Sequence, residues 1–117
     1  MVDTPNVAVL KSLLSVRRSV RSFREHPLSI TSLETLLHAG QGHTSPDGRR
    51  TAPSAHALYP LGLTVVVRRV QGLTPGVYTY DGRTGKLSRY GDALDVGSLN
   101  SAALGDEQWL EEAPAVI

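Results

Sequence analysis

Residues 17–23 read Arg-Arg-Ser-Val-Arg-Ser-Phe, and Arg24 follows directly. Four of the twelve Lys and Arg residues of the 117-residue chain therefore fall within eight positions. The preceding apolar pattern predicts that a helix ends at this point. A guanidinium at the inner face of such a helix is costly unless an anion neutralises it. We therefore expect this arginine cluster, defined as Arg17, Arg18, Arg21 and Arg24, to meet an anionic group.

The helix expected before the cluster spans roughly residues 7–17, with Asn6 as its N-cap. Its apolar side chains recur at spacings of three and four, and they are Val9, Leu10, Leu13, Leu14 and Val16. Arg17 lies four residues after Leu13 and continues this stripe, which predicts that its side chain points toward the interior. The helix is expected to break at Ser19, so that residues 20–23 run extended.

Composition narrows the class of protein. With 40% hydrophobic and 20% charged residues, the chain is expected to form a single domain over residues 1–117 with one modest core. A net charge of +1 provides no general attraction for nucleic acid or an anionic membrane, so neither is an expected partner. The chain has no cysteine, which excludes thiolate metal sites and is compatible with the expected cytoplasmic location.

The remaining patterns predict an α+β fold. A capping box at Thr31 to Glu34 starts a second helix that ends near Gly40, and a long polar loop follows over residues 41–56. Residues 61–70 read as a central strand covered on both faces, because Val65, Val66 and Val67 are consecutive apolar residues.

The second half of the chain predicts a hairpin and more helix. Strands over residues 76–80 and 86–90 flank a glycine-containing turn. Helices are expected over 92–103 and 106–112. Residues 111–117 read as a strand just starting, and a strand that begins on the last three residues has little to pair with. The order of elements favours helices against a mainly antiparallel sheet, with the fold incomplete in this chain.

Local motifs exclude several chemistries. Ser54 lacks the surrounding glycines of a nucleophile elbow and a spaced base, so a serine nucleophile is disfavoured. No phosphate-binding loop of the Walker type occurs. The histidines His38, His43 and His56 have no carboxylate or histidine partner at helical spacing, so we expect no metal site. The sequence identifies no catalytic residue.

Five motifs occur in an order that resembles the nitroreductase-like FMN-dependent family. They are RRSVRSF (17–23), PLSITSLETLLHAGQG (27–42), RRTAPSAHALYPL (49–61), GVYTYD (76–81) and ALGDEQWLEEAPAVI (103–117). Within that family they are most similar to the SagB-type dehydrogenases, which are associated with thiazole and oxazole formation in peptides. Members of the family often have glycine where His56 stands and glutamate where Gly62 stands. They also continue beyond the equivalent of Ile117, so we expect this chain to be the N-terminal portion of a longer protein.

The resemblance implies an FMN-dependent oxidoreductase, usually a homodimer with FMN at the subunit interface. Arg17, Arg18, Ser19 and Arg21 would contact the FMN phosphate and ribityl chain, and Pro53, Ser54 and Ala55 would lie against the isoalloxazine ring. Hydride would move to or from the flavin N5 atom. The partner in that exchange would be NAD(P)H, a peptide azoline, a nitroaromatic compound or a quinone.

Two other functions remain open from the sequence. The first is a non-catalytic flavin-binding or subunit-pairing remnant of the same fold. The second is a small α+β domain that binds an anion or nucleic acid, although only Phe23 among the aromatic residues lies near the arginine cluster in the sequence.

Overall fold

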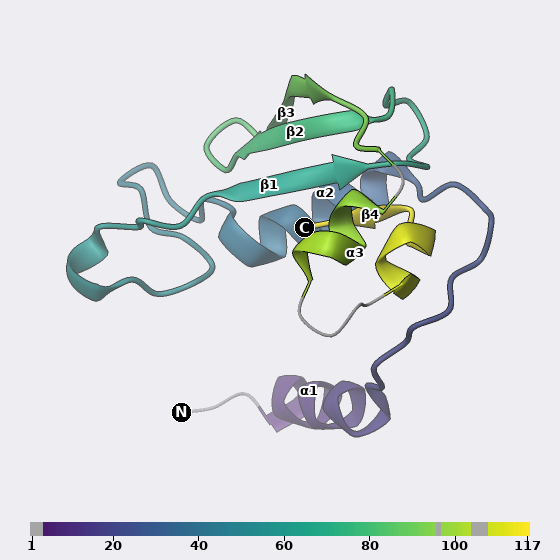
Figure 1. Ribbon diagram of the computed structural model, residues 1–117. Coiled ribbons are helices and arrows are strands. Elements are labelled where there is room, and N and C mark those ends of the chain that lie inside the picture. Colours follow the sequence, from purple (N-terminus) through teal and green to yellow (C-terminus); the bar gives the residue numbers. More distant parts are fainter. Residues whose placement is uncertain (1–3, 96, 104–107) are drawn as a thin grey trace.

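The computed structural model describes residues 4–95, 97–103 and 108–117, and within them it contains a sheet with one helix packed on its face (Figure 1). The longer helices are α1 (Thr4–Val16) and α2 (Ile30–Gln41), and the strands are β1 (Leu63–Val67), β2 (Gly76–Asp81), β3 (Lys86–Asp92) and β4 (Ala115–Val116). Shorter helical elements are α3 (Ser98–Ala102), η1 (Ala55–Ala57) and η2 (Gln108–Glu112). The predicted α+β class with an antiparallel sheet is confirmed.

The sheet has the strand order β3-β2-β1-β4, and each neighbouring pair is antiparallel. The predicted hairpin is present as β2 and β3, with Asp81 opposite Lys86 at its turn. β1 is a central strand, because β2 lies on one side and β4 on the other. The residues at 115–116 therefore do find a partner: Val116 is paired with Val66 and Ala115 with Val67.

The core lies between α2 and one face of the sheet. Its buried members are Leu33, Leu37, Val65, Val67, Val70 and Tyr78. Along β1 the side chains alternate, so that Val65 and Val67 are buried whereas Thr64 is exposed. The expectation of a strand covered on both faces is therefore wrong for this chain, because on the second face of β1 Thr64 is exposed and Val66 is only half-buried.

α2 begins two residues earlier than predicted. Ser29 is its N-cap, and the Ser29 hydroxyl oxygen accepts a hydrogen bond from the Ser32 backbone N–H at 3.1 Å. Thr31 thus lies inside the helix, and the capping box assigned to it is wrong. The helix also continues through Gly40 to Gln41, and Gly42 is its C-cap.

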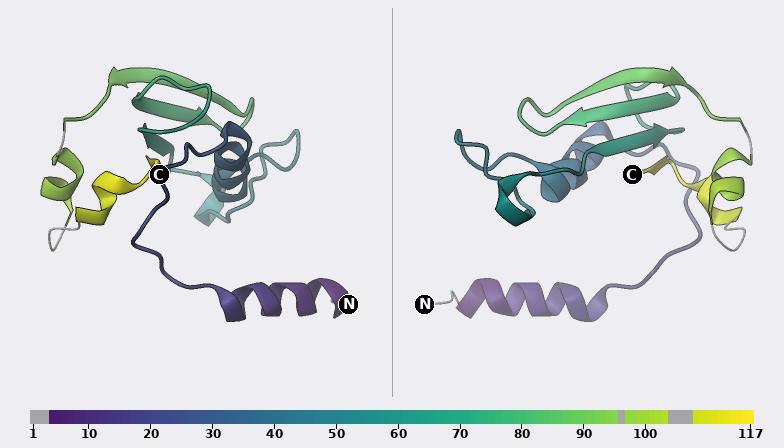
Figure 2. Two further views of the ribbon diagram at one scale, coloured as in Figure 1. Left: turned by 90° about the vertical axis from the view of Figure 1, so that its right-hand side faces the viewer. Right: turned by 60° about the vertical axis from the view of Figure 1, so that its left-hand side comes forward.

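α1 lies apart from the sheet and α2 in every view (Figures 1 and 2). None of its residues is buried, and its apolar stripe is exposed: Val9, Leu10, Leu13, Leu14 and Val16 are 56–69% accessible. Arg17 follows the helix and is exposed as well. The expectation that Arg17 points into the interior is therefore wrong within one chain, because none of the described residues buries the stripe that Arg17 continues.

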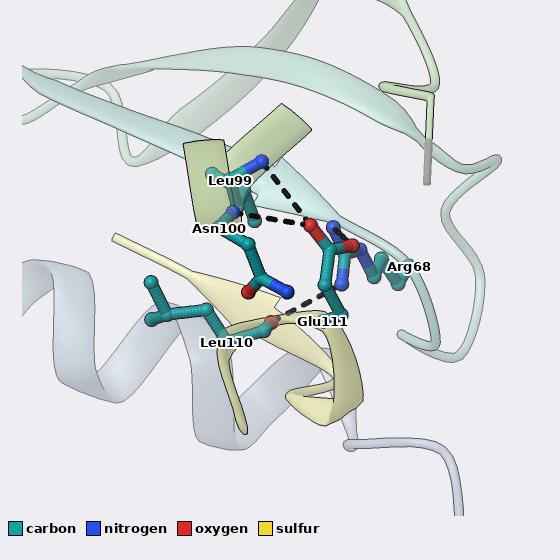
Figure 3. A network of polar contacts seen from close by, with 5 residues as sticks. All are labelled: Arg68, Leu99, Asn100, Leu110 and Glu111. Carbon is teal, nitrogen blue, oxygen red and sulfur yellow. Dashed lines mark hydrogen bonds and ion pairs between the residues drawn. The ribbon is translucent and has the colours of Figure 1, made fainter. Parts of the chain in front are cut away.

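The C-terminal elements are joined to the sheet by an ion pair (Figure 3). Arg68 Nη2 lies 2.6 Å from Glu111 Oε2, and both side chains are largely buried. Glu111 Oε1 accepts hydrogen bonds from the backbone N–H groups of Leu99 and Asn100, at 3.2 and 3.3 Å. Arg68 also donates to the Leu110 carbonyl oxygen at 3.1 Å. This network fixes η2 and α3 to the end of β1.

The predicted helix over 92–103 is mostly wrong. Asp92 ends β3, and the helix is restricted to Ser98–Ala102. Gly97 is the N-cap of this helix and has φ 88°, a left-handed conformation that suits glycine. The predicted helix over 106–112 is present as η2 over Gln108–Glu112, and positions 106 and 107 of the prediction lie outside the described part of the chain.

Candidate functional site

The arginine cluster lies in an extended, exposed segment after α1. Arg17, Arg18, Ser19 and Arg21 are all exposed. Arg18 Nη1 donates to the carbonyl oxygens of Ser15 and Arg17, at 3.0 and 2.8 Å, so this side chain folds back over the end of the helix. No ion pair is formed by these arginines within the described residues. Their positive charge is therefore available to an anion.

Trp109 joins this segment and was not predicted to do so. Its ring centroid lies 6.3 Å from that of Phe23, and the Arg21 guanidinium carbon lies 5.9 Å from the Trp109 ring. A cation over an indole ring is held by the quadrupole of the ring. Trp109 is far from Phe23 in the sequence, so no local pattern could have indicated this contact. The cluster thus has an aromatic neighbour that fixes the direction of Arg21.

The Pro53-Ser54-Ala55 segment lies on a surface loop that enters η1. Ser54 is half-buried, and its hydroxyl oxygen accepts a hydrogen bond from the Tyr59 backbone N–H at 2.8 Å. Pro53 and Ala55 are exposed. The Ser54 hydroxyl therefore closes the loop.

The residues after Ala55 adopt a conformation that side chains disfavour. His56 has φ 54°, Ala57 φ 52° and Tyr59 φ 43°. Residues other than glycine pay a steric cost in this left-handed region. The glycine that many family members carry at position 56 would avoid that cost, so the departure noted in the sequence coincides with a strained backbone position.

The structure does not bring the arginine cluster and the Pro53-Ser54-Ala55 segment together within one chain. The cluster lies after the end of α1, and the segment lies on the opposite side of the body, at the far end of β1 (Figures 1 and 2). The chemistry of the two sets suits a flavin nucleotide, because unpaired guanidinium groups bind phosphate and a small, rigid segment admits a flat ring. A single chain, however, cannot apply both sets to one molecule of FMN.

The largest hollow beside the Pro53-Ser54-Ala55 segment has a volume of about 440 Å³. Its polar lining includes Gln41, His43, Arg50, Tyr80 and Asp81, and the rest of the lining is Tyr59, Pro60, Leu61, Gly62, Leu63 and Gly82. A smaller hollow of about 220 Å³ adjoins it and is lined by Pro53 and Ser54. Arg50 and Tyr59 were not predicted as site residues from the sequence, because their proximity arises from the fold of the 41–59 loop.

Two titratable groups of this hollow have shifted pKa values. Burial raises the pKa of Tyr80, and the charges of Asp81 and Glu34 raise it further, so Tyr80 remains a protonated donor at neutral pH. The backbone N–H of Arg83 lowers the pKa of Asp81, with help from the Thr84 hydroxyl. Asp81 is thus ionised. Its Oδ1 accepts a hydrogen bond from the Arg83 backbone N–H at 2.9 Å, and its Oδ2 accepts one from the Thr84 hydroxyl at 3.1 Å.

The described residues contain no group of three histidine, cysteine or acidic side chains that would hold a metal ion. Across the same ranges, no helix combines the length and apolar character needed to cross a membrane.

Comparison with known proteins explains the combination of motifs. The model of the nitroreductase family matches residues 14–117. A protein of Methanocaldococcus jannaschii named "Putative nitroreductase MJ1384" is 37% identical over 118 aligned positions, which cover 99% of this chain and 59% of that protein. The chain thus spans about three fifths of the length of this relative. The matched region includes the arginine cluster, the Pro53-Ser54-Ala55 segment and the whole sheet. On these grounds the chain belongs to the nitroreductase family.

Proposed function

We propose that the chain is part of an FMN-dependent oxidoreductase. The observation that carries the proposal is the family match over residues 14–117, which includes both the exposed arginine cluster and the Pro53-Ser54-Ala55 segment. The relative named as a nitroreductase supports a redox activity. Arg17 is exposed in the single chain, so burial of its guanidinium does not support the proposal.

FMN would be held between two copies of the chain. Arg17, Arg18, Ser19 and Arg21 of one copy would hold the phosphate and ribityl chain, and Pro53, Ser54 and Ala55 of the other copy would lie against the ring. Two features support this arrangement. The two residue sets lie on opposite sides of one chain, and the apolar stripe of α1 beside the cluster is left uncovered. A homodimer would cover the stripe and supply the missing half of the site.

The bound flavin would supply the two-electron chemistry, with hydride moving to or from its N5 atom. The protein's part would be positioning. The guanidinium groups of Arg17 and Arg21 would neutralise the phosphate, and Trp109 would hold Arg21 in place. Backbone donors near Ser54 and Ala55 would face the ring and tune its reduction.

Two reactions fit such a site. In a nitroreductase, NAD(P)H would deliver hydride, and a nitroaromatic compound or a quinone would accept the electrons. In a SagB-type dehydrogenase, a peptide azoline would be oxidised to an azole, and oxygen would reoxidise the flavin. The name of the M. jannaschii relative favours the first reaction, whereas the motif order favours the second. Reduction of the flavin by NADPH, compared with reduction by an azoline peptide, separates them.

FMN binding is the decisive test. The chain has one tryptophan, so its fluorescence reports on Trp109 beside the arginine cluster. Titration with FMN should quench this fluorescence, and Arg17→Ala and Arg21→Ala should each weaken binding by about tenfold or more, because each removes a charge-assisted bond to phosphate. The exposed Lys86 on β3 provides a matched control, since Lys86→Ala removes a cation outside the proposed site.

The outcomes separate the alternatives. Absence of FMN uptake at high micromolar concentration would refute the proposal. Uptake without reduction by NADH, NADPH or an azoline peptide would favour the non-catalytic remnant. Oligonucleotide binding that weakens steeply with salt, and that depends on the same arginines, would favour the nucleic-acid-binding domain.

A further inference from the structure

The hollow beside the Pro53-Ser54-Ala55 segment contains an arginine whose charge is not compensated by a neighbour. The Arg50 guanidinium carbon lies 4.7 Å from the centroid of the Tyr59 ring, and Arg50 Nη1 donates to Gln41 Oε1 at 3.3 Å. Within the described residues, no carboxylate forms an ion pair with Arg50. The side chain is therefore held in place by a ring and an amide, neither of which neutralises it.

Arg50 also has a donor without an acceptor. Its Nε atom is buried and makes no hydrogen bond within the described part of the chain. Buried donors in native proteins are nearly always paired, so an isolated one indicates a missing partner. An oxygen of an anionic group would satisfy it, and the planar guanidinium is suited to bind such a group through two parallel bonds.

The backbone around Arg50 is ordered by the fold. His43 and Arg50 form an antiparallel bridge, and the Thr44 N–H donates to the Arg49 carbonyl oxygen at 2.8 Å. The His43 N–H donates to the Gly82 carbonyl oxygen at 3.1 Å, which ties this loop to the β2–β3 hairpin. Arg50 is thus carried by a loop fixed at both ends, which lowers the entropic cost of binding a ligand there.

The charged residues that line the hollow of Arg50 and an adjoining hollow carry a net positive charge. The hollow of about 440 Å³ and the adjoining one of about 290 Å³ share His43, Arg50 and Tyr59. Their charged lining consists of three arginines and two aspartates, and they are Arg49, Arg50, Arg83, Asp47 and Asp81. Asp47 pairs with Arg49 at 3.3 Å, and the Asp81 oxygens are bound to the hairpin turn. Among the described lining residues, Arg50 and Arg83 are therefore the arginines that form no ion pair, and Arg50 is the half-buried one of the two, whereas Arg83 is exposed.

We propose that Arg50, stacked on Tyr59, binds an anionic group, carboxylate or phosphate, of the molecule that exchanges electrons at the Pro53-Ser54-Ala55 segment. The hollow of Arg50 shares Gln41, Tyr59, Pro60 and Leu61 with the one lined by Pro53 and Ser54. An anion on Arg50 would thus leave the remainder of a small molecule beside that segment. The substrate role rests on the proposed function, whereas anion binding by Arg50 does not.

The first arm of the test measures binding without flavin. Isothermal titration of the purified chain compares benzoate with the neutral benzamide, and inorganic phosphate is titrated separately. We expect at least one anion to bind and benzamide to bind more weakly. The Arg50→Gln substitution should lower the affinity for the anion by about tenfold or more, because it removes a charge-assisted hydrogen bond. Arg89→Gln on β3 makes the same chemical change outside the hollow and should have no effect. Binding of neither anion, or equal binding by Arg50→Gln and the wild type, overturns the proposal.

The second arm identifies the source of the anion in the flavin-loaded protein. A carboxylate on the electron acceptor predicts that Arg50→Gln slows flavin reoxidation by 4-nitrobenzoate but not by 4-nitrobenzamide. A phosphate on the donor predicts slower flavin reduction by NADH but not by reduced nicotinamide riboside. A uniform loss with all four compounds contradicts a role for Arg50 in anion binding to either substrate.

Two controls keep the arms independent. Arg50→Lys retains the charge and loses the planar pair of donors, so its affinity for anions should lie between those of the wild type and Arg50→Gln. Thermal denaturation of both variants shows whether they remain folded. If the chain takes up no flavin, the proposed function fails, and the titration with benzoate and phosphate still decides whether Arg50 binds anions.

Discussion

Replacing Leu10 and Leu13 with glutamine should separate the proposed homodimer into monomers. Both leucines lie on the uncovered stripe of α1, where they are 56% and 62% exposed. Glutamine is a good helix former, so the substitution removes apolar surface and leaves the helix intact. Ser12→Gln, on the opposite face of the same helix, is the matched control.

The expected loss of dimer stability follows from the exposed fractions of the Leu10 and Leu13 side chains. Burying a fully exposed leucine stabilises by about 1.5–3 kcal/mol, so covering the exposed part of each of these side chains contributes about 1–2 kcal/mol. A symmetric dimer covers four of them, which gives about 4 kcal/mol or more. Since 1.4 kcal/mol corresponds to a factor of ten, the double variant should weaken self-association by roughly a thousandfold.

Sedimentation velocity over a range of concentrations measures this change. The wild type and Ser12→Gln should sediment as dimers at concentrations where the double variant is a monomer, and FMN affinity should fall in parallel. Circular dichroism should show an unchanged fold, because no residue of α1 is buried in the single chain. A wild type that stays monomeric at high micromolar concentration, or a double variant that dimerises as tightly as the wild type, would refute the reasoning.

Three further substitutions test the folded chain itself. His56→Gly should raise the free energy of unfolding by about 0.5–1 kcal/mol in urea denaturation, because relief at φ 54° exceeds the entropic cost of glycine; a loss of stability would contradict strain at this position. Gly82→Ala should destabilise by about 1–3 kcal/mol, since its Cβ would meet the Gln41 carbonyl oxygen; an unchanged urea midpoint would show that the loop yields freely. Burial opposes ionisation of Glu111, but the Asn100 N–H and the charge of Arg68 hold its pKa below the ordinary 4.5. Its stabilisation is therefore complete above that pH and lost as the pH falls through the lowered pKa, so Glu111→Gln should be less stable than the wild type at pH 7 and approach it in acid; a difference independent of pH would argue against ionisation as the cause.

The sequence by itself determined much of the sheet and the family to which the chain belongs. The hairpin over 76–90 was predicted because its glycine-containing turn and β-rich flanks are local signals, and strand pairing at a tight turn needs no distant partner. The resemblance to the nitroreductase family also followed from short motifs in order, and the match over residues 14–117 confirmed that family, whereas the SagB-type assignment stays a prediction. Local signals were less reliable at helix ends, where Ser29 was a better cap than Thr31 because its hydroxyl reaches the Ser32 N–H.

The tertiary structure decided what faces water and what lies together. The periodicity of α1 predicts an apolar face but not what covers it, so the exposure of Arg17 could not be read from the pattern. The contact of Trp109 with Arg21 and the stacking of Arg50 on Tyr59 join residues whose separation in the chain carries no periodic signal. Such contacts depend on how loops and sheet edges are placed, because burial and proximity are properties of the whole fold.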